Sequence, residues 1–217
     1  MSLFYLDSGP VAESGSYTTV FTLHGHTYHT PIFSRIIALA PSYNLRIVAI
    51  TRRDYPGSTP FSEEELRVAS KGSRKEKLGF LRDRAIEIWE FVRKFVKVNS
   101  IPRWNKSDGK GGVVVMGWSM GNSQGLGAMA YAREIKGVRE ELEPWMKGYI
   151  IYGEKVFFAY YFSRNLDIFF NYRKSFGPSA SRSFALVLAL PGEIPSSIRN
   201  DSSHSNHAIV LLQTPEH

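Results

Sequence analysis

The chain has 217 residues and a formal net charge of +7, from 27 lysine and arginine residues against 20 aspartate and glutamate residues. It contains no cysteine, which excludes disulfides, thiolate catalysis and cysteine-ligated metal sites, and its hydrophobic fraction of 43% is that of a globular protein. The length accommodates one domain with a sizeable core, and the excess of basic residues is typical of a solvated basic helix, so we expect no nucleic-acid partner.

The beginning of the sequence, Met1 to Asp7, has neither a basic stretch nor a long apolar stretch, so we expect no signal peptide. No run approaches the ~18 consecutive apolar residues that a membrane helix needs. We therefore expect a cytoplasmic protein without a transmembrane segment. The sequence does not predict the oligomeric state.

Apolar runs and turn residues divide the first part of the chain into alternating strands and helices. Residues 1–17 are polar and rich in turn formers, which predicts a loop or a short edge strand. The β-branched runs 18–24 and 45–51 predict two buried strands. Pro31 begins a helical segment between them. The apolar stripe of that segment consists of Phe33, Ile36, Ile37 and Leu39.

Two serines mark helix starts, because each precedes a glutamate by three positions, the spacing of a capping box. They are Ser62 with Glu65 and Ser73 with Glu76. The second pair opens a long helix, in which apolar residues recur at helical spacing with arginines and lysines between them.

Further strands follow this helix. The run 113–116 predicts a buried strand, a helix follows it to about Ile135, and 148–152 predicts the next strand. Continuous apolar strands that alternate with helices imply a parallel sheet covered on both faces. Ligands of such sheets bind at the carboxyl ends of the strands, where residues 24–26 and Ser119 both lie.

The strongest motif is Gly117-Trp118-Ser119-Met120-Gly121, a Gly-x-Ser-x-Gly pattern between a predicted strand and a predicted helix. It predicts a very sharp turn with Ser119 at its apex, because a side chain at either glycine would collide with neighbouring backbone. The turn lifts the hydroxyl above the sheet edge. A serine hydroxyl becomes a nucleophile when a base, usually an imidazole, accepts its proton.

Two backbone N–H groups are expected to bind the oxyanion that such an attack creates. One belongs to Met120, directly after the serine, and the other to His26 in the loop after the first strong strand. We expect the His24 ring to orient this loop rather than to act as the base. An alternative assigns His24, His26 and His29 to a metal, but glycine and threonine around them fit a turn and no carboxylate pattern accompanies them. We therefore expect no metal and no cofactor.

Three motifs follow one another along the chain. They are Phe21-Thr22-Leu23-His24-Gly25-His26, residues 46–50 with 53–60, and residues 117–121. Together they resemble the α/β-hydrolase superfamily, and within it the fungal serine hydrolases with an esterase- or epoxide-hydrolase-like core. The resemblance covers roughly residues 4 to 153. It implies an α/β fold with a mainly parallel, doubly wound sheet, a Ser119 nucleophile, and an oxyanion hole at His26 and Met120.

The remainder of the chain departs from the family pattern, which places an acid and then a histidine after the serine. The candidate acids are Glu193 and Asp201, and the candidate bases are His204 and His207, with His217 further along. His207 precedes the apolar run 208–212, whereas the family's histidine normally follows such a run. We therefore expect a shortened family member whose C-terminal part is incomplete or irregular.

These observations predict a hydrolase core over residues 1–154, followed over 155–217 by a lid-like aromatic segment and a degenerate C-terminal portion of the same domain. The serine favours cleavage of an ester or amide. The aromatic run 156–162 would cover the pocket, so a small apolar ester is the expected substrate.

Two other functions compete with this hypothesis. The first is a non-catalytic protein of the α/β-hydrolase fold that lacks a working catalytic histidine. The second is a basic binder of RNA or a membrane surface, with salt-sensitive binding. Its binding residues would be Lys75, Lys77, Arg82, Arg84 and Lys94.

Overall fold

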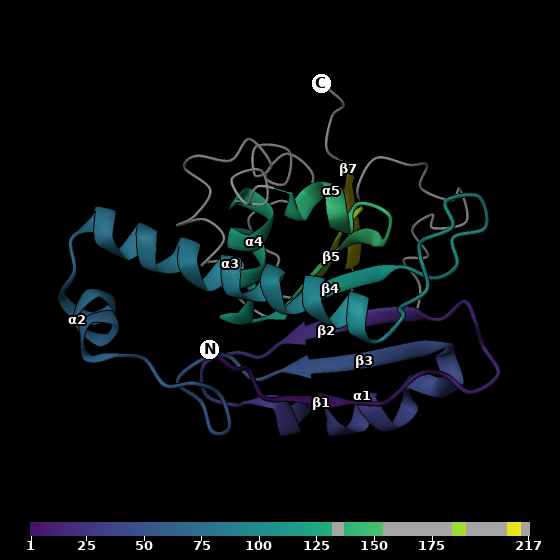
Figure 1. Cartoon of the computed structure of the whole chain (residues 1–217), viewed down its shortest axis with the longest axis horizontal. Helices are drawn as coiled ribbons and strands as arrows, with labels where there is room; N and C mark the ends of the chain where they lie inside the picture. Colours follow the sequence, from purple (N-terminus) through teal and green to yellow (C-terminus); the bar gives the residue numbers. More distant parts are fainter. Residues whose placement is uncertain (132–136, 154–183, 190–207, 214–217) are drawn as a thin grey trace.

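The structure is a computed structural model that describes residues 1–131, 137–153, 184–189 and 208–213 (Figure 1). It has an α/β fold built on a mixed, mostly parallel sheet with the strand order β1-β3-β2-β4-β5-β6-β7. The strands are β1 (Tyr5–Asp7), β2 (Thr18–Leu23), β3 (Leu45–Ile50), β4 (Val113–Trp118), β5 (Met146–Gly153), β6 (Phe184–Ala189) and β7 (Ala208–Gln213). The expected α/β class and mainly parallel sheet are therefore confirmed.

The sheet has four parallel strands in its middle and one antiparallel pairing on either side of them. β2, β3, β4 and β5 run parallel, and β7 runs parallel to β6. β1 pairs with β3 in the antiparallel direction, as the short edge strand that the N-terminal residues predict, and β6 is antiparallel to β5. The chain leaves β2 toward β3 on one side and later returns to β4 on the other, so the strand order reverses between β2 and β4.

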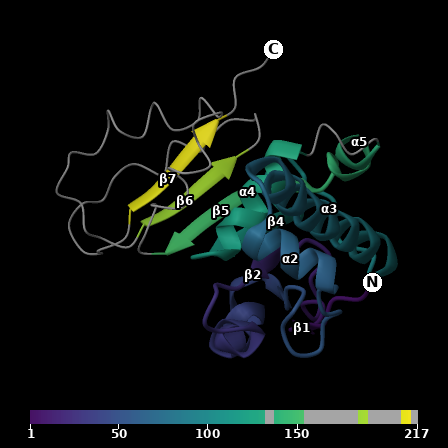
Figure 2. The ribbon, with the colours of Figure 1, turned by 90° about the vertical axis from the view of Figure 1, so that its left-hand side faces the viewer.

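Helices cover both faces of the sheet. They are the 3-10 helix η1 (Thr30–Phe33), α1 (Ser34–Leu39), the 3-10 helix η2 (Ala40–Tyr43), α2 (Glu63–Lys71), α3 (Arg74–Val98), α4 (Gly121–Tyr131) and α5 (Val138–Leu142). Phe21 and Leu23 of β2 face the large core under α3, whereas Val20 faces a smaller cluster with Ala40 of η2. Figures 1 and 2 accordingly place α3 and α1 on opposite sides of the strands.

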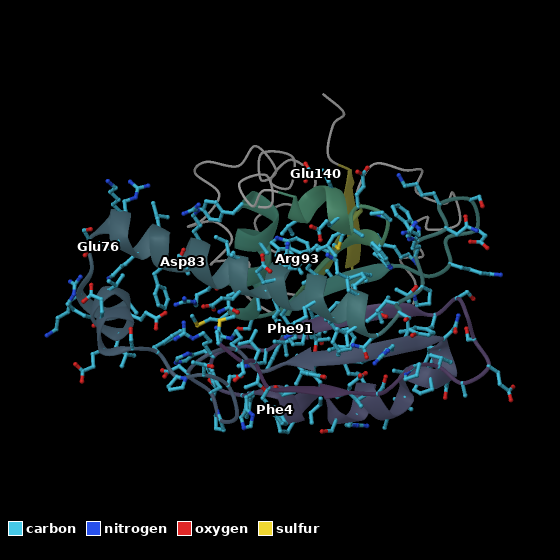
Figure 3. All side chains as sticks on the ribbon, viewed as in Figure 1. Phe4, Glu76, Asp83, Phe91, Arg93 and Glu140 are labelled. Atoms are coloured by element: carbon cyan, nitrogen blue, oxygen red, sulfur yellow. The ribbon has the colours of Figure 1, made fainter. Side chains whose placement is uncertain are left out.

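The underside of α3 carries much of the larger core. Its Phe91 side chain points from the helix toward the sheet (Figure 3). The Phe91 ring meets Tyr5 of β1 edge-on at a centroid distance of 5.3 Å and Phe21 of β2 at 6.2 Å. Edge-on aromatic pairs of this kind contribute about 0.5–1.5 kcal/mol beyond the area that they bury.

Both predicted capping boxes are formed. Ser62 accepts a hydrogen bond from the Glu65 N–H at the start of α2, and the Glu65 carboxylate accepts one from the Ser62 N–H. Ser73 and Glu76 repeat the arrangement at the start of α3. Each cap satisfies backbone donors that the helix leaves unpaired, a contribution of about 1 kcal/mol.

The predicted apolar stripe after β2 is partly wrong. Phe33 is buried, but Ile36 and Leu39 are 40% and 56% exposed. The segment is not one α-helix, because 3-10 turns that begin near Pro31 and Pro41 flank α1. Ile36 and Leu39 lie inside α1 itself, where it is Ile37 that packs against the smaller cluster.

Candidate active site at the carboxyl ends of β2 and β4

Ser119 stands at the apex of the turn between β4 and α4. Its backbone has a φ of +52°, a left-handed conformation that L-residues rarely adopt and that costs about 1–3 kcal/mol. Two hydrogen bonds fix this strained residue: its N–H donates to the Tyr152 carbonyl at 2.9 Å, and its carbonyl accepts from the Asn122 N–H at 3.0 Å. The Ser119 side chain is exposed. The sharp turn that Gly-x-Ser-x-Gly predicts is present.

The glycines that flank the turn are required by close packing. A Cβ atom on Gly121 would lie 2.2 Å from the Leu23 carbonyl oxygen at the end of β2. A Cβ atom on Gly117 would lie 2.8 Å from the Cα atom of Asn122 in α4. Real Cβ contacts are never this short, so α4 can approach the sheet only because both positions lack a side chain.

The loop after β2 lies directly beside Ser119. Leu23 and Gly117 are partners in the parallel pairing of β2 with β4, so the chain leaves both strands at the same level. A Cβ atom built on Gly25 would stand 3.2 Å from the Ser119 Cβ and 3.5 Å from the Trp118 carbonyl oxygen. Crevices at such a reversal of strand order are the usual ligand sites of open α/β sheets.

Both backbone groups expected to bind an oxyanion belong to residues just beyond the ends of β2 and β4. Within residues 1–131 and 137–153, neither the Met120 N–H nor the His26 N–H donates a hydrogen bond. Met120 follows Ser119 in the turn, and His26 follows Gly25 in the adjacent loop. The fold therefore brings the predicted nucleophile and the residues of its predicted oxyanion hole into one neighbourhood.

His24 is buried and has partners for both ring nitrogens. Its Nδ1 lies 2.8 Å from the Gly25 carbonyl oxygen, and its Nε2 accepts a hydrogen bond from the Arg52 N–H at 3.0 Å. Burial lowers the pKa of His24 to about 4, so the ring is neutral near pH 7. His24 thus orients the loop, as its position predicts, and is not available as a base or as a metal ligand.

The predicted acid and base residues fall on another part of the chain. Glu193, Asp201, His204, His207 and His217 lie outside the described residues, and so does the aromatic run 156–162. Among the residues that the structure does describe, the Ser119 hydroxyl has no hydrogen-bond partner. No group of three histidine, aspartate or glutamate side chains in the described part of the chain is placed to hold a metal ion.

An aromatic cluster that the sequence did not reveal borders the serine. The Trp118 ring is stacked on the Tyr28 ring at a centroid distance of 6.1 Å and an angle of 24°, and it meets Phe33 edge-on at 6.4 Å. Tyr28 is 56% exposed. Trp118 occupies a variable position of the serine motif, and its two partners come from the segment after β2, so only the folded chain brings these rings together.

The hypothesis of a basic binding surface is wrong in one of its residues. Arg84 is buried, and its guanidinium pairs with Glu65 at 2.9 Å and with Glu87 at 2.7 Å. Arg53 joins the same carboxylates at 2.6 and 3.1 Å and lowers the pKa of Glu65 to about 2. Arg84 therefore belongs to an internal ion-pair network that ties α2, α3 and the segment after β3 together.

No protein-family model matches this chain, and no curated protein matches it. In the described part of the chain, every helix is too short or too polar to cross a lipid bilayer.

Proposed function

We propose that the protein is a serine hydrolase of the α/β-hydrolase type that cleaves a small apolar ester through Ser119. One observation carries the proposal. An exposed serine is held at a φ of +52° between a parallel strand and a helix, beside a second loop with a backbone N–H group that has no acceptor among the described residues. Backbone strain at a polar, exposed residue is typical of functional sites.

In the proposed reaction the Ser119 hydroxyl oxygen attacks the ester carbonyl carbon while a base accepts the hydroxyl proton. The N–H groups of Met120 and His26 donate hydrogen bonds to the oxyanion of the tetrahedral intermediate. The intermediate collapses to an acyl-enzyme, and the alcohol leaves with the proton from the base. Water then attacks the acyl-enzyme, releases the carboxylic acid and restores the serine.

The base is proposed to be His204 or His207, oriented by Glu193 or Asp201. The environment of His24 supports a base that follows Ser119 in the sequence, because both ring nitrogens of His24 have hydrogen-bond partners and its pKa is about 4. A neutral ring with no free nitrogen cannot take the serine proton.

The preference for an apolar ester rests on Trp118 and Tyr28, whose stacked rings adjoin the serine turn. Aromatic faces beside a nucleophile favour apolar acyl or alcohol groups over charged ones, because contact removes apolar surface from water. A negatively charged substrate group would lose hydration at the same rings without gaining a partner.

Hydrolysis of short-chain nitrophenyl esters tests this function. We expect activity in the wild-type protein, its loss in Ser119→Ala, and unchanged activity in Ser42→Ala, which removes an exposed hydroxyl elsewhere. His204→Ala and His207→Ala, made singly, identify the base: one of them should lower kcat about 10³-fold or more. If the wild-type protein has no activity above the Ser119→Ala variant, the alternative function, a non-catalytic protein of this fold, replaces the proposal.

A further inference from the structure

Arg52, at the carboxyl end of β3, is a buried cation without a carboxylate partner among the described residues. Arg52 is only 8% exposed, and its Nε has no hydrogen-bond partner in the described part of the chain. The neighbouring Arg53, by contrast, pairs with two glutamates. Burial of a charge without a counter-charge is costly. Such arrangements are concentrated at functional sites, and Arg52 lies one loop away from Ser119.

The guanidinium of Arg52 is directed at the loop after β2. Its Nη2 donates to the Gly25 carbonyl oxygen at 2.7 Å and to the Tyr55 hydroxyl at 3.1 Å. The same Gly25 oxygen lies 2.8 Å from His24 Nδ1, and the Arg52 N–H donates to His24 Nε2. The backbone N–H and the guanidinium of Arg52, the ring of His24 and the Gly25 carbonyl thus form a closed network of hydrogen bonds.

Tyr55 also belongs to this hydrogen-bond network. Its hydroxyl donates to the His26 carbonyl oxygen while it accepts from Arg52. The Tyr55 ring also meets His24 edge-on at 4.5 Å and lies 5.1 Å from the Arg52 guanidinium carbon. Two consecutive carbonyl groups of the loop, those of Gly25 and His26, are therefore both held by side chains from the segment after β3.

This restraint fixes where the amide groups of the loop point. In a trans peptide the N–H group points away from the C=O group of the same unit, and the described residues contain no cis peptide. Since the Gly25 carbonyl faces Arg52, the His26 N–H faces away from it. A donor to the Gly25 carbonyl also polarises this peptide and strengthens the His26 N–H as a hydrogen-bond donor.

We propose that Arg52 and Tyr55 are positioning residues of the oxyanion hole, which hold the Gly25 and His26 carbonyls so that the His26 N–H faces a ligand at Ser119. The inference rests on the proposed hydrolase function and deepens it. Neither side chain touches the substrate. Both act through the peptide groups of the loop, at the point where Gly25 contacts the serine.

The test is the steady-state kinetics of ester hydrolysis by the full chain. Tyr55→Phe removes only the hydroxyl and keeps the ring contacts, and we expect kcat to fall about 10- to 100-fold with KM within about twofold, because the oxyanion exists only in the transition state. Arg52→Lys should retain more activity than Arg52→Gln. Tyr43→Phe, the same deletion at a residue that is 72% exposed, is the matched control and should have wild-type kinetics.

A second readout separates positioning from a general loss of structure. A short-chain alkyl boronic acid forms a tetrahedral adduct with an active serine, so its Ki should rise in Tyr55→Phe by the factor by which kcat/KM falls. An active wild-type protein with unchanged kcat and Ki in Tyr55→Phe would overturn the positioning role and leave the hydrolase function standing. A rise in KM alone would make Tyr55 a substrate contact and would also overturn it. A wild-type protein without activity overturns the hydrolase function itself.

Discussion

Gly25 lies against Ser119, with a Cβ atom built on the glycine only 3.2 Å from the serine Cβ. This contact joins the loop after β2 to the turn after β4. It exists because Leu23 and Gly117 are paired where the two strands end. The distance is tight but not impossible for a real side chain, so the site would tolerate a methyl group only if Ser119 moved by a few tenths of an ångström.

Gly25→Ala should therefore reduce activity more than stability. We expect the free energy of unfolding to fall by about 1 kcal/mol, as for mild overpacking. The rate of ester hydrolysis should fall by a larger factor, because the nucleophile and the oxyanion donors shift relative to each other. Gly15→Ala, where the added methyl meets no atom within 4 Å, is the control. Equal rates in both variants would show that the contact does not position the serine.

Gly121→Ala should destabilise the fold itself. The added Cβ would lie 2.2 Å from the Leu23 carbonyl oxygen, which belongs to the backbone of a central strand. We expect a loss of about 3 kcal/mol or more in urea unfolding, because α4 must move away from the sheet. Gly79→Ala in α3 meets no atom within 4 Å and should instead stabilise by about 1 kcal/mol through helix propensity. A neutral Gly121→Ala variant would contradict the close approach of α4.

His24 should make stability depend on pH in the mildly acidic range. Burial lowers its pKa from 6.5 to about 4, so between these values the ring is protonated in the unfolded chain but neutral in the fold. The neutral ring's contribution to the free energy of unfolding is complete above pH 6.5. It is lost as the pH falls toward 4, for a total of up to about 3 kcal/mol. Chemical unfolding at several pH values measures it. His24→Gln should be less stable at pH 7 and should lack this part of the pH dependence; an identical dependence in the variant would contradict the burial of a neutral ring.

The ion-pair network under α2 and α3 should be sensitive to loss of one member. Glu87→Gln removes the charge that pairs with the buried Arg84 and with Arg53, and we expect a loss of about 3 kcal/mol in the free energy of unfolding. Glu64→Gln removes a carboxylate that is 68% exposed from its pair with Arg67 and should leave the free energy of unfolding almost unchanged, because water screens an exposed ion pair. Equal effects of the two substitutions would show that the network is solvated.

Short sequence patterns predicted the strands and helix starts that depend only on residues close together in the chain. The apolar runs of β2, β3 and β4 and the serine–glutamate spacing before α2 and α3 each act within a few residues, and the structure contains all of them. The exposure of Ile36 and Leu39 was not predicted, because only the folded chain shows that α1 packs against the smaller cluster through Ile37.

Some features of the candidate site were also predictable from the sequence, and others were not. The turn at Ser119 was predictable from its glycines, and its place beside residue 25 followed from the alternation of strands and helices. The stacking of Trp118 on Tyr28 and the hold of Arg52 and Tyr55 on the loop were not predictable, because each joins segments that meet only through the order of strands in the sheet. The sequence Thr51-Arg52-Arg53 does not reveal that Arg53, and not Arg52, is the arginine that pairs with glutamates.

If Ser119 is an activated nucleophile, its hydroxyl oxygen should react covalently with a fluorophosphonate. Mass spectrometry of the labelled, digested protein should find the phosphonyl group on the peptide that contains Ser119, with labelling abolished in Ser119→Ala and retained in Ser42→Ala. A wild-type protein that stays unlabelled at Ser119 under conditions that label a known serine esterase completely would contradict the account.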